Sequence, residues 1–210
     1  MRKLTPFLLL GSILLAMTSC QKEKSVDTLS HGSGSAGSTG SEKGTWKFLF
    51  MQAATSQTIE YKDGIDDVKT VTISDYTTEN NAGTVKFDGS KMTATGLTYS
   101  VDAMAKGYLY TNGVLEDSLE FPFAATVPPT SSTASYKKAG ADSIYVQSGV
   151  FTGIGSGGTT QATPGGYKLK FNGDKMTMTT VYDDTKLEFV MGMSQKTISH
   201  AVVVLTLQKQ

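Results

Sequence analysis

The sequence contains one cysteine and two histidines, and these three residues limit the chemistry that the chain can do. A zinc site needs several cysteine or histidine ligands, and a nucleophilic Cys–His pair needs both partners in one domain. Cys20 and His31 lie near the N-terminus, so His200 is the single histidine of the long remainder. We therefore expect a non-enzymatic protein that holds no metal and no cofactor.

Residues 1–19 have the pattern of a bacterial secretion signal. Arg2 and Lys3 form a positive start, and an apolar run of about ten residues follows between Phe7 and Ala16. This run is shorter than the roughly twenty residues that a membrane-spanning helix needs. Removal of the signal leaves a slightly acidic mature chain without a basic cluster, so we expect no nucleic-acid partner.

Cys20 is the predicted site of lipidation. Thr18 and Ser19 provide the small side chains that a lipoprotein signal peptidase needs before the cysteine, and residues 15–20 resemble a lipobox, with Met17 in the place usually held by leucine. The alternative is a general secretory signal with an incidental cysteine. We favour lipidation because the only cysteine of the chain lies where the anchor is required.

The predicted anchor places the protein on a membrane through residues 20–43. Each buried CH₂ of an acyl chain contributes about 0.8 kcal/mol, so two or three chains would make the attachment effectively permanent. Gln21, rather than aspartate, follows the cysteine, which favours the outer membrane and leaves the leaflet open. Within residues 30–41, nine of twelve are Gly or Ser, and this composition predicts a flexible linker.

Residues 44–210 are predicted to form one all-β domain. Apolar and polar residues alternate with a period of two, which indicates half-buried strands. The last segment, residues 201–207, is apolar on both faces and is predicted to be a central strand. The alternating apolar sets are Trp46, Phe48 and Phe50; Val71 and Ile73; Leu119, Phe121 and Phe123; Met176 and Met178; and Leu187, Phe189, Met191 and Met193.

Short turn signals separate these segments. Asp88–Gly89, Asn112–Gly113 and Asn172–Gly173 tolerate the positive φ angles of tight hairpins. The best candidate for a short helix is residues 132–139, with Ser132 as its N-cap. The pattern predicts an antiparallel meander of about ten strands.

Two similar hairpin sequences occur in the chain, at residues 86–93 and at residues 170–177. Two hairpins of one sheet could have converged on the same turn. The alternative is a duplicated half-domain, which would give a pseudo-symmetric barrel or two packed sheets. The sequence outside the hairpins favours convergence, because the two halves do not align there.

The segment Gly44-Thr45-Trp46-Lys47 is informative in this context. A signal, a lipidated cysteine, a polar linker and a Gly-x-Trp first strand before a β-meander resemble the lipocalin-like lipoproteins common in Bacteroidetes. This resemblance implies a single calycin-type antiparallel β-barrel, in which Trp46 closes the barrel base beneath a basic residue from a late strand. A two-sheet β-sandwich is the alternative fold.

Several weaker patterns are interpreted as structural. Residues 153–158 fit Gly-x-Gly-x-x-Gly, but no helix follows to hold a phosphate, so we expect a loop. Two acidic groups, at residues 63–67 and 183–184, lack the spacing of a calcium site and are predicted to be solvated turns. His200 begins an apolar strand without a Gly-x-Ser-x-Gly elbow elsewhere, so a structural histidine is favoured over a Ser–His–Asp triad.

The side chains that remain as candidates for ligand binding are aromatic rings and methionine thioethers. Tyrosines can stack on sugars or line a cavity, and methionines adapt to irregular apolar ligands. The first hypothesis is a monomer whose barrel interior takes a small apolar or amphipathic ligand, with Tyr108, Tyr110, Met176 and Met178 as candidate contacts. The second is a surface interaction or glycan-binding module without an internal ligand.

Overall fold

The computed structural model describes residues 40–155, 158–161, 164–190 and 192–210. These residues form eleven β-strands, and nine of the strands belong to one antiparallel sheet. The predicted all-β, antiparallel fold class is therefore confirmed. Within the same ranges the structure contains no helix of the length and apolarity that crossing a membrane requires. The predicted signal, Cys20 and most of the predicted linker lie outside the described residues.

The strands are β1 (Gly44–Asp63), β2 (Asp66–Thr77), β3 (Glu79–Phe87), β4 (Lys91–Thr111), β5 (Val114–Lys138), β6 (Ser143–Val146), β7 (Thr152–Gly155), β8 (Gly158–Gln161), β9 (Gly165–Asn172), β10 (Lys175–Val190) and β11 (Met193–Lys209). Residues 201–207 lie within β11, which pairs with β1 on one side and β10 on the other. The expectation of a central last strand is confirmed.

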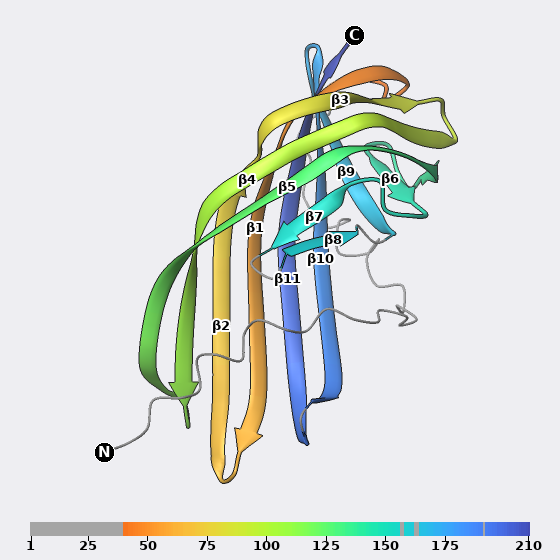
Figure 1. The fold of residues 1–210 in the computed structure, drawn as a ribbon. Helices are drawn as coiled ribbons and strands as arrows, with labels where there is room; N and C mark the ends of the chain where they lie inside the picture. The colour runs from red at the N-terminus through yellow and green to blue at the C-terminus, as the bar shows by residue number, and fades with distance from the viewer. Residues whose placement is uncertain (1–39, 156–157, 162–163, 191) are drawn as a thin grey trace.

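The nine-stranded sheet closes in a ring at one end of the molecule (Figure 1). There the neighbours run β1, β3, β4, β5, β6, β9, β10 and β11, and β11 pairs with β1 to complete the circle. The ring is not a regular barrel, because β6 and β9 are short while their neighbours are long. The two similar hairpins, β3–β4 and β9–β10, lie four places apart in this ring of eight strands, on opposite sides.

The hydrophobic core lies inside the ring. Side chains from all around it are almost fully buried, and the largest of them are Trp46, Phe48, Met51, Phe87, Met92, Leu97, Tyr99, Ile144, Met176, Met178, Leu205 and Leu207. Burial of this apolar surface is the main favourable contribution to folding. Aromatic pairs add to it, for example Phe48 and Tyr99 with ring centroids 5.6 Å apart.

The hairpin β7–β8 packs against the open mouth of the ring. Phe151, just before β7, lies 6.2 Å from Phe48 between ring centroids. The Tyr76 hydroxyl donates to the carbonyl of Ile154 at 2.5 Å, and the buried Tyr99 hydroxyl donates to the carbonyl of Thr152. Residues 153–155 and Gly158 therefore belong to the paired strands β7 and β8, and the expectation of a loop is corrected at these described residues.

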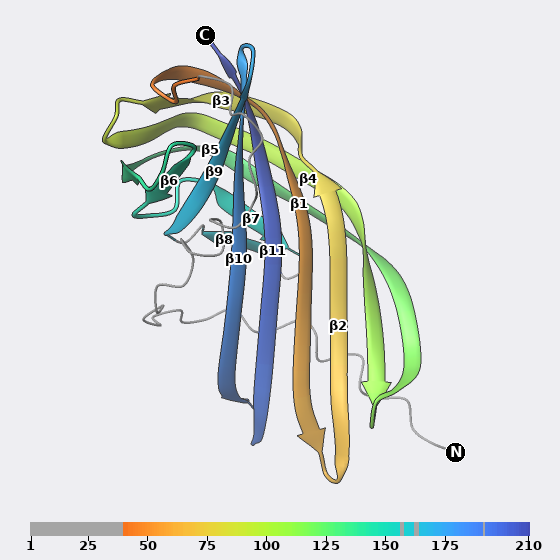
Figure 2. The same ribbon diagram turned by 180° about the vertical axis from the view of Figure 1, so that it is seen from behind.

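Beyond the ring, six strands continue as a single layer (Figures 1 and 2). We call this part the extension; its strand order is β5, β4, β2, β1, β11, β10. Strand β9 pairs with β10 only up to Thr179, and β6 pairs with β5 only over residues 136–138. The distal parts of β10 and β5 therefore become the two edges of the extension.

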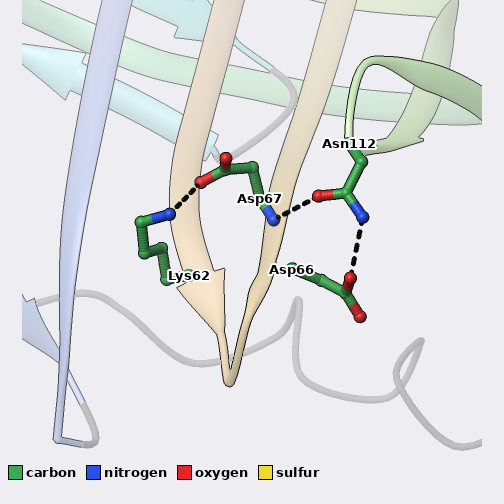
Figure 3. A network of polar contacts seen from close by, with 4 residues as sticks. All are labelled: Lys62, Asp66, Asp67 and Asn112. Carbon is green, nitrogen blue, oxygen red and sulfur yellow. Dashed lines mark hydrogen bonds and ion pairs between the residues drawn. The ribbon is translucent and has the colours of Figure 1, made fainter.

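Hydrogen bonds connect two of the hairpin ends of the extension (Figure 3). The Asn112 side chain accepts a hydrogen bond from the Asp67 backbone amide at 2.9 Å and donates to Asp66 at 2.7 Å. Lys62 pairs with the Asp67 carboxylate at 2.7 Å. Asn112 has a φ of 51°, as its predicted turn requires. The turns predicted at Asp88–Gly89 and Asn172–Gly173 are also present.

Three local expectations are corrected. Residues 132–139 do not form a helix, because β5 continues to Lys138 and pairs with β4 through Ser132 and Ser135. A register shift between Phe48 and Phe50 interrupts the alternation that Trp46 and Phe48 begin. Asp183 and Asp184 lie within β10 rather than in a turn.

The segment 187–193 is not one half-buried strand. A turn at Gly192, which has a φ of 83°, separates β10 from β11. Leu187 and Phe189 are 75% and 78% exposed, so their apolar alternation does not mark a buried face.

Stability measurements can distinguish the ring core from the extension. We expect Met178→Ala to lower the free energy of unfolding by about 2–5 kcal/mol, because it leaves a cavity in the packed ring. The control Leu187→Ala removes an exposed side chain and should change it by no more than about 0.5 kcal/mol. Urea denaturation of both variants checks this; equal losses would contradict a core confined to the ring.

Candidate functional site

Trp46 lies near the start of β1, in the ring, and is 1% exposed. Its indole nitrogen donates to the backbone carbonyl of Glu42 at 2.7 Å. The Lys209 ammonium, from the last strand, lies 5.5 Å from the centroid of the indole ring, within the range of a cation–π interaction. Trp46 therefore connects the residues before β1 with the end of β11.

Glu42 is a buried carboxylate with two polar partners. Its side chain is 2% exposed, its Oε2 lies 3.1 Å from Lys138 Nζ, and its Oε1 accepts a hydrogen bond from the Tyr136 hydroxyl at 3.2 Å. Burial raises the pKa of Glu42, but the hydrogen bonds and the charge of Lys138 outweigh it, so the pKa lies below 4.5. Glu42, which lies near the end of the predicted linker, therefore packs against the folded domain through these contacts.

The four candidate ligand contacts do not form one site. Met176 and Met178 point into the ring and are fully buried. Tyr108 and Tyr110 are half-exposed and lie on the extension, where they face away from the side that continues the ring interior. This separation could not be predicted from the sequence, because alternation alone does not show where a sheet leaves its core.

The two faces of the extension differ in chemistry. We call the inner face the one that continues the ring interior, and the outer face the opposite one. On the inner face, the four central strands of the described extension contribute only uncharged side chains between the ring and the distal turns. These are Thr55, Gln57, Ile59, Tyr61, Val68, Thr70, Thr72, Ser74, Ala105, Gly107, Leu109, Thr111, Gln195, Thr197, Ser199 and Ala201.

Hydroxyl and amide groups make the inner face a hydrogen-bonding surface. The Thr55 and Ser74 hydroxyls lie 2.7 Å apart, and the Gln195 amide donates to Thr197 at 3.3 Å. On the edge strand, burial raises the pKa of the Tyr182 hydroxyl to about 12, with a smaller contribution from Asp184. Tyr182 therefore stays neutral at physiological pH and can both donate and accept a hydrogen bond.

The outer face of the extension carries paired charges. The Lys106 ammonium lies 3.0 Å from Glu120, and the Lys196 ammonium lies 3.3 Å from Glu60. The Lys69 ammonium lies 4.5 Å from the centroid of the Tyr110 ring. Exposed pairs of this kind stabilise little, but they give each charge a partner within the sheet.

His200 belongs to a row of residues on the outer face. Its Nδ1 lies 2.6 Å from Asp183 of β10, and Ser56 of β1 is its cross-strand partner on the other side. A Ser–His–Asp triad that catalyses acyl transfer also needs hydrogen-bond donors aimed at the oxyanion. Strand β1 is paired along both edges at Ser56, so its amides there belong to the sheet. We interpret the contact between His200 and Asp183 as a surface hydrogen bond and not as part of a catalytic triad.

An open depression lies on the same face near the ring. Its volume is about 410 Å³, and residues of β1, β2 and β11 line it, among them Ala54, Asp75, Val202 and Val204. Ala54 leaves space between larger neighbours. Among the described residues, no group of three or more histidine, cysteine, aspartate or glutamate side chains has the arrangement of a metal site.

Comparison with protein-family models, with curated proteins and with solved structures finds no match to this chain.

The Glu42 cluster predicts a pH-dependent stability. Because the pKa of Glu42 is lowered on folding, its ionised form stabilises the protein above about pH 4.5, and this contribution is lost as the pH falls through the folded-state pKa. We expect Glu42→Gln to lower the free energy of unfolding by about 1.5–3 kcal/mol at pH 7, and by less below pH 4.

Urea denaturation at pH 7 and pH 3.5 measures this difference, with the exposed Glu116→Gln as the control. A difference between wild type and Glu42→Gln that is the same at both pH values would be inconsistent with the buried ion pair.

Proposed function

We propose that this protein is a lipid-anchored interaction module that binds a neutral glycan on the inner face of its extension. One observation carries the proposal: a broad sheet face, open to solvent, presents hydroxyls, amides and aromatic rings but no charge on its four central strands. Most solvated sheet faces carry charged residues, as the outer face of this extension does.

Neutral glycans are recognised by hydrogen bonds to their hydroxyls and by aromatic rings that lie against the sugar faces. On the inner face, Thr70, Thr72, Gln57 and Ser199 present donors and acceptors on adjacent strands about 4.8 Å apart. Tyr61 and Tyr182 provide aromatic rings on the same face. An extended polysaccharide could lie across these strands.

A small apolar ligand inside the ring has less support. Met176 and Met178, which were candidate contacts for such a ligand, are fully buried among other side chains, and the hairpin β7–β8 adds Phe151 and Ile154 to that core. These side chains occupy the space that an internal ligand would need.

Anchoring at Cys20 accounts for the remaining features of the sequence. A secretion signal, a single cysteine at its end and a Gly/Ser-rich linker are what a membrane-attached binding domain requires. The proposed location is the outer membrane. The resemblance to lipocalin-like lipoproteins agrees with the proposed lipid anchor. It differs from the glycan proposal in the place of the binding site, which it would assign to the ring interior.

The glycan proposal is tested by affinity electrophoresis in gels that contain soluble neutral polysaccharides such as dextran, mannan or xyloglucan. We expect at least one of them to retard the protein, and Tyr182→Ala to weaken the binding about tenfold through loss of a stacking ring. The matched control is Tyr110→Ala on the outer face, which should bind like wild type. Equal effects of both substitutions, or no retardation in any gel, would contradict the proposal.

The anchor is tested separately by mass spectrometry of the protein isolated from membranes of a diderm host. We expect the mature chain to begin at Cys20 and to carry a diacylglyceryl thioether. Cys20→Ala should abolish the modification and release the protein into the soluble fraction. A wild-type chain with a free thiol at position 20 would contradict the anchoring.

A further inference from the structure

The distal part of β10 is an edge with unusual features. Beyond Thr179, residues 180–190 have no partner strand on the side away from β11 among the described residues. The strand pairs with β11 without a register shift and contains no proline. Three of its outer-face side chains are exposed and apolar: Val181 at 41%, Leu187 at 75% and Phe189 at 78%. Such an edge is a template for a further strand.

The opposite edge, β5, is protected. Within the extension it carries Pro122, opposite Met104, and a proline in a strand removes a donor from the edge it faces. Its pairing with β4 also shifts register between Leu109 and Tyr110, and such an irregularity twists an edge away from a flat partner. Of the two edges of the extension, only β10 is therefore regular and rich in donors.

We propose that two copies of this chain associate through antiparallel pairing of their β10 edges about a two-fold axis at Thr185. Thr185 is the midpoint of residues 180–190, so this register uses the whole free edge and ends before β9. A two-fold axis perpendicular to the sheet keeps the inner faces of the two copies on the same side. Each residue of one copy then lies opposite the residue of the second copy that is equally far from Thr185 in the other direction. This inference does not depend on the glycan proposal.

Two kinds of side-chain pair in this register are complementary. Asp184 would face Lys186 of the second copy on the inner face, and Val181 would face Phe189 of the second copy on the outer face, each twice by symmetry. Within one chain, the Lys186 ammonium lies 3.7 Å from the Asp184 carboxylate, so both charged groups lie on the same face of the sheet. Opposite charges and apolar pairs across strands are stabilising.

Neighbouring registers suit the same side chains less well. A shift that places the axis at Asp184 would put the two Asp184 carboxylates opposite each other, and a shift to Lys186 would do the same for two ammonium groups. An axis at Leu187 would avoid a like-charge pair but would leave much of the free edge unpaired. The charge pattern and the edge length therefore select Thr185.

The proposed dimer joins two extensions into one continuous sheet with a doubled inner face. Antiparallel pairing directs the two closed rings toward opposite ends. If both chains are tethered to one membrane, the joined sheet must lie roughly parallel to that membrane.

Cysteine cross-linking tests the axis directly in the full-length chain. In the proposed dimer, Thr185→Cys brings two cysteines to directly opposite positions, with Cα atoms about 5 Å apart, which is compatible with a disulfide. In Leu187→Cys the two copies would be about 14 Å apart, too far for a disulfide. We expect a covalent dimer from Thr185→Cys under mild oxidation and none from Leu187→Cys.

Wild type, whose only cysteine is Cys20, controls for bridging through that residue. A covalent dimer from Leu187→Cys, or none from Thr185→Cys, would overturn the proposed axis.

Charge reversal gives a second test by sedimentation velocity in detergent. Lys186→Asp would place like charges opposite each other at two positions and should raise the dimer dissociation constant about tenfold or more. The double variant Asp184→Lys/Lys186→Asp restores the complementary pairs and should recover dimerisation. A wild-type chain that sediments as a monomer at micromolar concentration would overturn the proposal, as would a double variant no better than Lys186→Asp.

Discussion

Backbone pairing between strands of unequal length is the constraint on which the rest of this structure depends. Strands β6 and β9 are long enough to complete the ring at one end, but they stop while β5 and β10 continue. The sheet can therefore close around a core only where all eight neighbours are present. Beyond that point the same strands must continue as an open layer with two edges.

This division separates stability from binding. Inside the ring, apolar side chains from opposite strands pack together and contribute most of the favourable free energy of folding. In the extension, cross-strand side-chain pairs and the ladders of long hairpins hold the layer together, because the described residues place no second layer against either face along most of its length. Side chains there are constrained less by packing, so their chemistry can follow the demands of a ligand or partner.

Much of the fold follows from the sequence, because period-two alternation and Asn-Gly or Asp-Gly turns are local properties. The extension does not. Leu187 and Phe189 alternate with polar residues just as Met176 and Met178 do, yet the first pair is exposed and the second is buried. The difference arises from where the pairing of β9 with β10 stops, at Lys168 and Thr179, and this depends on a separate strand of the sheet. The bulge between Phe48 and Phe50 likewise reflects pairing with β11.

Residues 132–139 also show that local sequence preferences do not determine the structure of this chain. Serine at a possible N-cap, followed by alanine and lysine, favours a short helix locally. Pairing with β4 overrides that preference, because it buries Ala134 and Tyr136 on the inward side of β5. For the candidate site, the sequence could identify tyrosines and hydroxyl-bearing residues on strands. It could not assign them to faces that remain open, since that assignment needs the topology of the whole sheet.

The central claim is that the extension is a single layer, accessible from both sides. Hydroxyl-radical footprinting of the tyrosines measures this directly. A single open layer should give similar, rapid labelling of Tyr61 and Tyr182 on the inner face and of Tyr108 and Tyr110 on the outer face. Tyr99 and Tyr167 in the ring should be strongly protected. If Tyr61 and Tyr182 were protected as strongly as Tyr99, the inner face would be covered and the account would be wrong.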